Sequence, residues 1–130
     1  MADYLPVYTP GQAVSLTTSA AVTGGTLAAV SGDGTVAAAG AGSAKVVGVF
    51  ACDAGSGTRV TVWLRGPVHE VVNSGGVTAG DQLVSAASGQ VATLAVASGA
   101  TAGDINSARS VVGIALNTAT TGLKVRYVAC

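Results

Sequence analysis

Residues that could carry out acid–base or metal chemistry are few in this chain of 130 residues. His69 is the only histidine, and Glu70 follows it directly in a segment of alternating apolar and polar residues. Neighbouring side chains of a strand point to opposite faces, so His69 and Glu70 are not placed to act on one substrate. We interpret His69 as a surface residue or a satisfied polar residue. A lone histidine, with two cysteines that share no CxxC motif, predicts no metal site.

Short motifs that bind phosphate or calcium in other proteins are incomplete here. The segment GAGSAK at 40–45 lacks the spacing and the Lys-Ser/Thr pair of a phosphate loop, and Gly-Asp-Gly at 32–34 lacks the other ligands of a calcium loop. No Gly-x-Ser-x-Gly nucleophile motif occurs. We therefore predict no catalytic residue, no cofactor and no metal, and we expect the protein not to be an enzyme.

The two cysteines, Cys52 and Cys130, read as free thiols, because disulfides are rare in a reducing compartment. A bridge between two strand ends remains the alternative.

Two long segments of the chain repeat. VVGVFACDAGSGTRVTVWL (46–64) recurs without a gap as VVGIALNTATTGLKVRYVA (111–129), and PGQAVSLTTSAAVTGG (10–25) recurs as RGPVHEVVNSGGVTAG (65–80). The first offset is 65 positions (111 − 46) and the second is 55 (65 − 10), which places an insertion in the second copy at about 93–110. We interpret 11–130 as a single β domain made of two similar halves, 11–65 and 66–129.

The repeated segments have the pattern of β-hairpins, with an apolar strand, a Gly/Ser/Thr turn and an alternating strand. Gly48 and Gly113 interrupt apolar strands at equivalent places, which predicts a bulge or a close backbone contact. Many short strands divided by glycines indicate an all-β barrel or sandwich. The expected strands are 12–18, 26–30, 35–38, 45–51, 58–64, 67–72, 81–86, 90–94, 110–116 and 123–128.

Trp63 is the side chain best suited to binding a protein. It shares the polar face of its strand with Arg59, and its counterpart in the repeat, Val128, shares a face with Lys124 and Arg126. An exposed tryptophan is a natural interface anchor. The alternative is that loops or the N-terminal arm of the same chain cover it.

The first ten residues form a second candidate interface. Two prolines within five residues favour an extended arm, and its side chains are unusually apolar for a chain terminus. This arm, 1–10, either packs on its own barrel or lies on a neighbouring subunit. The predicted interface residues are Tyr4, Leu5, Pro6, Val7, Tyr8, Trp63 and Val128.

The composition restricts the classes of partner. Formal net charge is zero and only 9% of residues are charged, so the basic surface of a nucleic-acid-binding protein is missing. A weakly charged surface on a small domain favours a packed, assembled state. The sequence contains neither a secretory signal nor about 20 consecutive strongly apolar residues, so we expect folding in a cytoplasm without membrane contact.

Across nearly its whole length the sequence resembles the small capsid-decoration (cement) proteins of tailed bacteriophages. These proteins combine "VG-apolar-A" strands, a "G-D-x-V" turn, a "G-x-V" strand and a short alternating end strand. The matching segments here are VVGVFACDAGSGTRVTVWLRGPVHEVV, VTAGDQLVSAASGQVA and VVGIALNTATTGLKVRYV. The insertion at about 93–110 departs from the pattern.

The resemblance implies a β-barrel or β-tulip body on the outer capsid surface of a virion. It also implies the major capsid protein as partner, often with assembly into a homotrimer. The alternative is another virion or cell-surface β-module, such as a fibre base, an adhesin or a carbohydrate-binding domain. The last of these predicts several exposed aromatic residues, whereas the chain has a single tryptophan.

Overall fold

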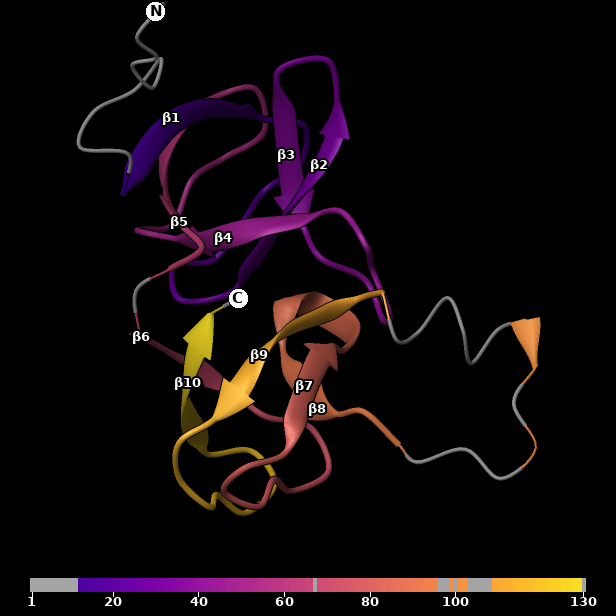
Figure 1. Cartoon of the computed structure of the whole chain (residues 1–130). Helices are drawn as coiled ribbons and strands as arrows, with labels where there is room; N and C mark the ends of the chain where they lie inside the picture. Colours follow the sequence, from indigo (N-terminus) through magenta and orange to yellow (C-terminus); the bar gives the residue numbers. More distant parts are fainter. Residues whose placement is uncertain (1–11, 67, 96–98, 100, 103–108, 130) are drawn as a thin grey trace, which may run out of the picture.

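The computed structural model describes residues 12–66, 68–95, 99, 101–102 and 109–129 (Figure 1). Within these residues all ten expected strands are present, each end within two residues of its predicted position. The strands are β1 (Ala13–Thr18), β2 (Leu27–Gly32), β3 (Thr35–Ala38), β4 (Val46–Phe50), β5 (Arg59–Leu64), β6 (Val68–Val72), β7 (Gln82–Ser85), β8 (Val91–Thr93), β9 (Val111–Ala115) and β10 (Lys124–Ala129), with the 3₁₀ helix η1 (Ala87–Gly89) between β7 and β8. The prediction of an all-β fold with a barrel is confirmed.

The closed barrel is formed by the first half alone, in the order β1-β3-β2-β4-β5. Antiparallel pairing of β5 with β1, from Ala13↔Trp63 to Thr17↔Arg59, completes the ring, and β1 meets β3 in parallel. The residues that fill its interior are Val22, Ala28, Val36, Phe50, Val60 and Val62. Closure pairs the strand edges of this half with one another.

The second half forms a five-stranded sheet in the order β6-β10-β9-β7-β8. We call two residues counterparts when they are related by the offsets of 55 or 65 positions. Counterpart strands follow each other in the same order in both halves. The parallel pair Thr18↔Val36 of the barrel has its counterpart in the isolated parallel bridge Asn73↔Val91. The shared strand order is a structural fact, whereas descent of both halves from one unit stays a prediction.

Gly48 and Gly113 lie where two backbones approach closely. A Cβ atom on Gly48 would lie near the carbonyl oxygen of Trp63, and one on Gly113 near that of Val128. The pairing of β2 with β4 and of β7 with β9 shifts register directly beside these glycines. The expected bulge or close contact is therefore confirmed at both positions.

A buried polar side chain ties the end of the first strand to the hairpin turn in each half. The Asn73 Nδ2 group donates to the carbonyl oxygens of Thr120 and Leu123, at 2.8 Å each. Its counterpart Thr18 has its Oγ1 atom 2.5 Å from the carbonyl oxygen of Gly55, the counterpart of Thr120. Both side chains are buried, so these bonds replace contacts with water that folding removes.

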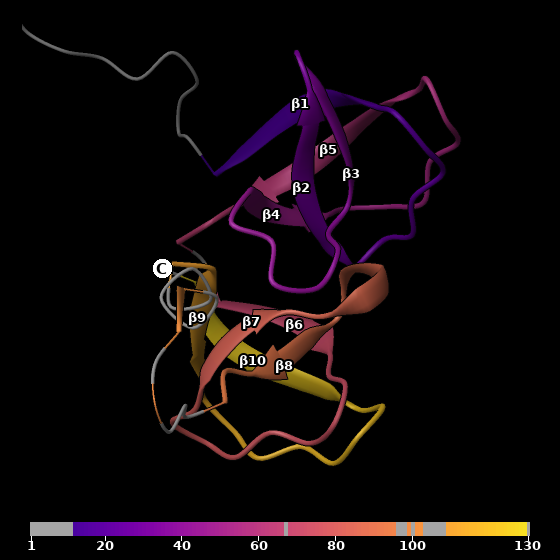
Figure 2. The same cartoon turned by 90° about the vertical axis from the view of Figure 1, so that its right-hand side faces the viewer.

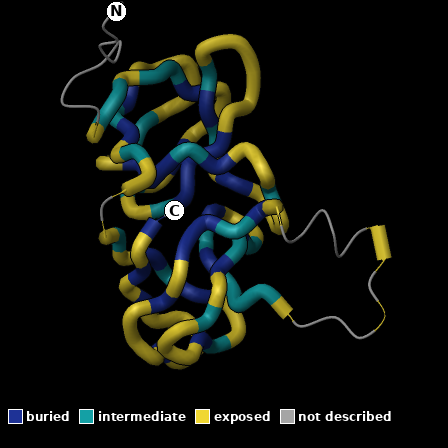
Figure 3. Tube along the Cα trace, viewed as in Figure 1, coloured by how far each residue is buried: buried dark blue, intermediate teal, exposed yellow. Residues whose placement is uncertain are grey.

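The two halves pack on each other through one apolar cluster. Its members from the first half are Leu27, Ala29, Ala39, Val46 and Val49, and the remainder come from the second half. Figure 2 shows η1 between the second sheet and the barrel, and Figure 3 shows buried segments where the halves meet. Within the described residues, no helix has the length and apolar character needed to cross a membrane.

Candidate interaction surfaces

His69 and Glu70 point to different faces of β6, as their adjacent positions predict. The His69 Nε2 atom lies 3.1 Å from the carbonyl oxygen of Leu64, and its ring centroid is 6.0 Å from that of Tyr127. Glu70 is exposed and pairs with Arg126, whose guanidinium lowers the pKa of the carboxyl group. Burial raises the pKa of the Tyr127 hydroxyl, which stays neutral. No three His, Cys, Asp or Glu side chains gather among the described residues.

Cys52 is an exposed free thiol. Cys130 lies outside the described residues, so the expectation that both cysteines are unpaired stays a prediction.

Val128 lies at the centre of an exposed apolar row on the second sheet. In β10 it pairs with Val68 of β6 on one side and with Ile114 of β9 on the other. Paired residues of neighbouring strands share a face, so the three side chains lie next to one another. Their exposed fractions are 55% for Val68, 40% for Val128 and 44% for Ile114. We call Val68, Val128 and Ile114 the free row.

The counterpart row in the first half is partly covered. It runs from Ala13 through Trp63 and Val49 to Leu27, by the pairings of β1, β5, β4 and β2. Val49 and Leu27 are buried in the cluster between the halves, whereas Trp63 is 44% exposed. Among the described residues Trp63 is exposed, whereas its cover by the arm, 1–10, concerns residues outside the described ones and stays the alternative.

Charged side chains lie beside both rows. Arg59 lies four residues before Trp63 and donates from Nη2 to the carbonyl oxygen of Ser15, at 3.1 Å. Beside the free row, Glu70 and Arg126 neutralise each other across β6 and β10. Such exposed ion pairs add little to stability. The two rows are therefore apolar strips, and Arg59, Glu70 and Arg126 beside them already have hydrogen-bond or ion-pair partners.

The predicted interface residues fall into two groups. Trp63 and Val128 are described and exposed, whereas Tyr4, Leu5, Pro6, Val7 and Tyr8 lie outside the described residues. The chain from those five residues enters β1, whose first residue, Ala13, pairs with Trp63.

Sequence reasoning missed Val68 and Ile114. Each is an ordinary apolar residue of a strand, and only the register across β6, β10 and β9 brings them to one face beside Val128. The neighbours of Val128 across the sheet cannot be named without that register.

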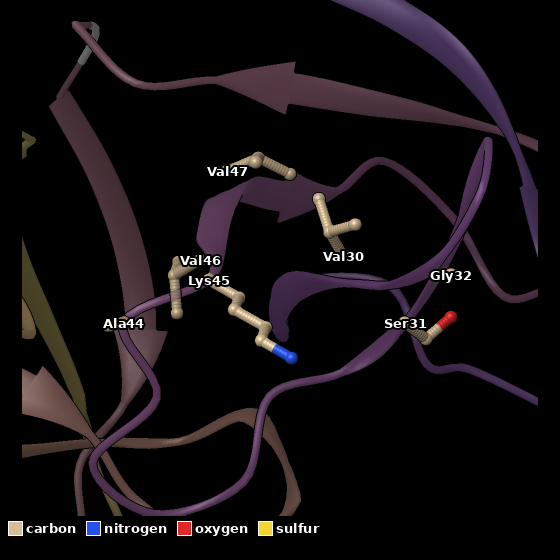
Figure 4. Close-up of a pocket in the computed structure, with 7 residues that line it drawn as sticks. All are labelled: Val30, Ser31, Gly32, Ala44, Lys45, Val46 and Val47. Carbon is tan, nitrogen blue, oxygen red and sulfur yellow. The ribbon is translucent and has the colours of Figure 1, made fainter.

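Two cavities among the described residues lie away from the residues of both rows. The larger, about 460 Å³, is lined by Val30, Ser31, Gly32, Ala44, Lys45, Val46 and Val47. Figure 4 shows Val30 and Val47 directed toward one another across it. The smaller, about 180 Å³, lies between the halves, with Thr26 of the first half and Gly89 of the second among its lining residues. The larger cavity has one charged residue, Lys45, and neither contains a pair of groups suited to acid–base catalysis.

Comparison with solved structures identifies a similar fold. The chain resembles the crystal structure of the head fiber gp8.5 N base in bacteriophage phi29, with a TM-score of 0.65. The match covers 91% of this chain and 92% of that one. The two sequences are 18% identical. The likeness shows a shared fold. No protein-family model matches the chain, and the search of curated proteins found no match.

Proposed function

We propose that the protein is a non-enzymatic structural component of a bacteriophage virion. In this proposal it folds in the host cytoplasm and binds the major capsid protein on the outer capsid surface, as a decoration or cement protein. The observation that carries the proposal is Trp63, an exposed tryptophan on an apolar strip of a weakly charged barrel. The shared fold with a phage head fiber base supports the same class.

The attachment surface in this proposal is the outer face of β5 and β1 around Trp63. The arm residues Tyr4, Leu5, Pro6, Val7 and Tyr8 precede β1 and are assigned to the same surface. Tryptophan side chains that fill a partner's pocket are common hot spots, and their truncation costs roughly 2 kcal/mol or more. The affinity of a single copy that attaches by one aromatic residue and an arm is modest, but the many copies on one capsid together stabilise it effectively.

A lattice contact of this kind depends little on salt. The 12 charged side chains (6 basic and 6 acidic) are spread over the whole chain, and Arg59, Glu70 and Arg126 beside the rows already have partners. Apolar burial is not screened by ions, whereas contacts between exposed charges are.

Substitution of Trp63 tests the attachment surface. We expect Trp63→Ala to weaken capsid binding by about 30-fold or more, which corresponds to roughly 2 kcal/mol. Leu123→Ala is the matched control, because Leu123 is also apolar and exposed but lies in the turn before β10. Binding is measured as occupancy on purified capsids that lack the protein. Equal occupancy for Trp63→Ala and the control would remove Trp63 from the contact.

Deletion of residues 1–9 tests the arm. We expect the truncated chain to have the same melting temperature as the full chain, because the described barrel begins only at β1. We expect its occupancy on capsids to be lower than that of the full chain. Retained occupancy together with a large loss of stability would show that the arm belongs to the core instead.

A fibre base is the second candidate function. The specific observation in its favour is the fold shared with the head fiber base of bacteriophage phi29. The two functions predict different results for capsids without the protein. A cement role predicts capsids that disrupt at lower temperature or lower ionic strength, whereas a fibre base predicts equally stable capsids that lack a projecting density in cryo-electron microscopy.

A further inference from the structure

The two halves of the chain contact each other at Gly89 of η1 and at Ser85 of β7, and we call these two contacts together the joint. At η1 the second half presents Gly89, whose backbone N–H donates to the carbonyl oxygen of Ala39 at 2.9 Å. A Cβ atom on Gly89 would lie 2.7 Å from the Cβ of Thr26, so the turn is in close contact with the first half. Under this turn Leu27 and Ala39 are fully buried. A turn of the second half therefore covers the outer face of the first.

A loop of the first half completes the joint at Ser85. The backbone N–H groups of Gly42 and Ser43 donate to the Ser85 carbonyl and hydroxyl oxygens, at 2.9 and 2.8 Å. The Ser85 hydroxyl donates to the carbonyl oxygen of Gly40 at 2.7 Å. Ser85 is buried by these contacts.

The covered face of the first half consists of Leu27, Ala39 and Val49, and the residues at the equivalent positions of the second half are exposed or partly exposed. Gln82, Leu94 and Ile114 are the counterparts of Leu27, Ala39 and Val49. Gln82 and Ile114 are exposed and Leu94 is partly exposed among the described residues. The backbone matches as well, since the N–H of Leu94 donates to the Gln82 carbonyl at 2.8 Å and that of Ala39 donates to the Leu27 carbonyl at 2.9 Å.

The counterpart of the covering turn is open on the first half. The turn Gly32–Gly34 corresponds to η1, and Gly34 has a φ of +69° where Gly89 has +73°. All three residues of the turn are exposed. Val30, the counterpart of the buried Ser85, is 41% exposed and lines the larger surface cavity (Figure 4). One chain therefore presents a turn and a face that match the turn and the face of the internal joint, both exposed and on opposite halves.

We propose that a second copy of the chain docks head to tail at these two surfaces. The Gly32–Gly34 turn of one copy lies on the Ile114 end of the free row of the next, as η1 lies on the first half within each chain. The occupant is a second copy because the chain carries the turn whose counterpart already binds the equivalent face.

The docking contact is more polar than the internal joint. Gln82 stands where the internal joint has Leu27, and Asp33 stands where it has Ser88. A smaller apolar area predicts association that is reversible at micromolar concentrations. The contact uses two different surfaces, so it repeats from copy to copy until it closes into a ring. The docking rests on these two surfaces of the chain, and not on attachment to a capsid.

Two complementary variants of the full chain test the proposal. Ile114→Arg places a charge on the face that receives the turn. Val30→Glu places a charge beside the Gly32–Gly34 turn, where Lys45 is near enough to pair with the new carboxylate. In sedimentation velocity across micromolar to millimolar concentrations, we expect the wild type to form a defined oligomer and each variant to be monomeric. An equimolar mixture should form a heterodimer and nothing larger, because each variant retains one intact surface.

Controls separate docking from folding. Leu123→Arg places the same charge at an exposed apolar position outside both surfaces and should assemble as the wild type does. Ile114→Thr keeps a β-branched residue in β9 and should raise the dissociation constant at least ten-fold with an unchanged circular dichroism spectrum. A monomeric wild type, or a mixture of variants that stays monomeric, overturns the proposal. If monomeric protein still occupies capsids through Trp63, docking fails while the proposed function stands.

Discussion

Adding one methyl group at Gly113 should separate two strands of the second sheet. The Cβ of an alanine there would lie near the Val128 carbonyl oxygen, 2.6 Å from a ring carbon of Tyr127 and 2.9 Å from the Val128 carbonyl carbon. Real Cβ contacts with backbone atoms are longer than 3 Å. Because two of these atoms are backbone, a side-chain rotation does not relieve the contact, and β9 must move away from β10.

The cost of that movement has two parts. Forcing extra volume into a packed site costs about 1–3 kcal/mol. The pairing of β9 with β10 covers only Ala115, Ile114 and Gly113 on the β9 side, so the shift also strains a short ladder whose hydrogen bonds contribute about 1 kcal/mol each. Together these effects predict a loss of about 2–4 kcal/mol in the free energy of unfolding for Gly113→Ala.

The assay is urea unfolding followed by circular dichroism, with Gly40→Ala as the matched control. A Cβ atom added at Gly40 would meet no heavy atom within 4 Å, and its φ is not positive, so the alanine variant should stay within about 0.5 kcal/mol of the wild type. At about 3–5 °C per kcal/mol for a chain of this size, Gly113→Ala should lower the melting temperature by roughly 10 °C. A Gly113→Ala variant as stable as Gly40→Ala would refute the close-contact argument.

Two further predictions concern hydrogen bonds and charge. Asn73→Ala should lower the free energy of unfolding by about 2–4 kcal/mol, because the buried carbonyl oxygens of Thr120 and Leu123 lose their side-chain donor. Urea unfolding measures this loss, and a loss below about 0.5 kcal/mol would contradict the prediction. Because Arg126 lowers the folded-state pKa of Glu70, the stabilisation from this pair is present above the unfolded pKa of about 4.5 and is lost as pH falls through the folded value. Glu70→Gln should therefore flatten the stability profile below pH 5, and an unchanged profile would show that the exposed pair contributes nothing.

The strands were predictable because their local signals agree with the fold. Alternation at Val60 and Val62 places both side chains inside the barrel, and Gly34 occupies a positive-φ turn position. The expected hairpins are the antiparallel pairs β4–β5 and β9–β10. These features depend on residues close together in the sequence, where propensity and periodicity are informative.

Contacts between distant segments were not predictable in the same way. The barrel closes because Ala13 meets Trp63, and the free row exists because Val68 meets Val128. Alternation assigns each of these residues to a face, but the register that sets their neighbours depends on long-range pairing. The exposure of Trp63 stayed open for the same reason, since only the arrangement of the halves decides which end of its row is covered.

The joint at Ser85 also determines where the chain accepts additional sequence. The connection after β3 is held at Gly40, Gly42 and Ser43, so lengthening it would disrupt the packing of the halves. Its counterpart after β8 is ten residues longer, yet the hydrogen bond of Leu94 to Gln82 before it and the register of β9 after it match those of the first half. Loop length costs little free energy when the flanking pairs are kept. We therefore expect a foreign peptide inserted between β8 and β9 to change the free energy of unfolding less than the same peptide inserted after β3.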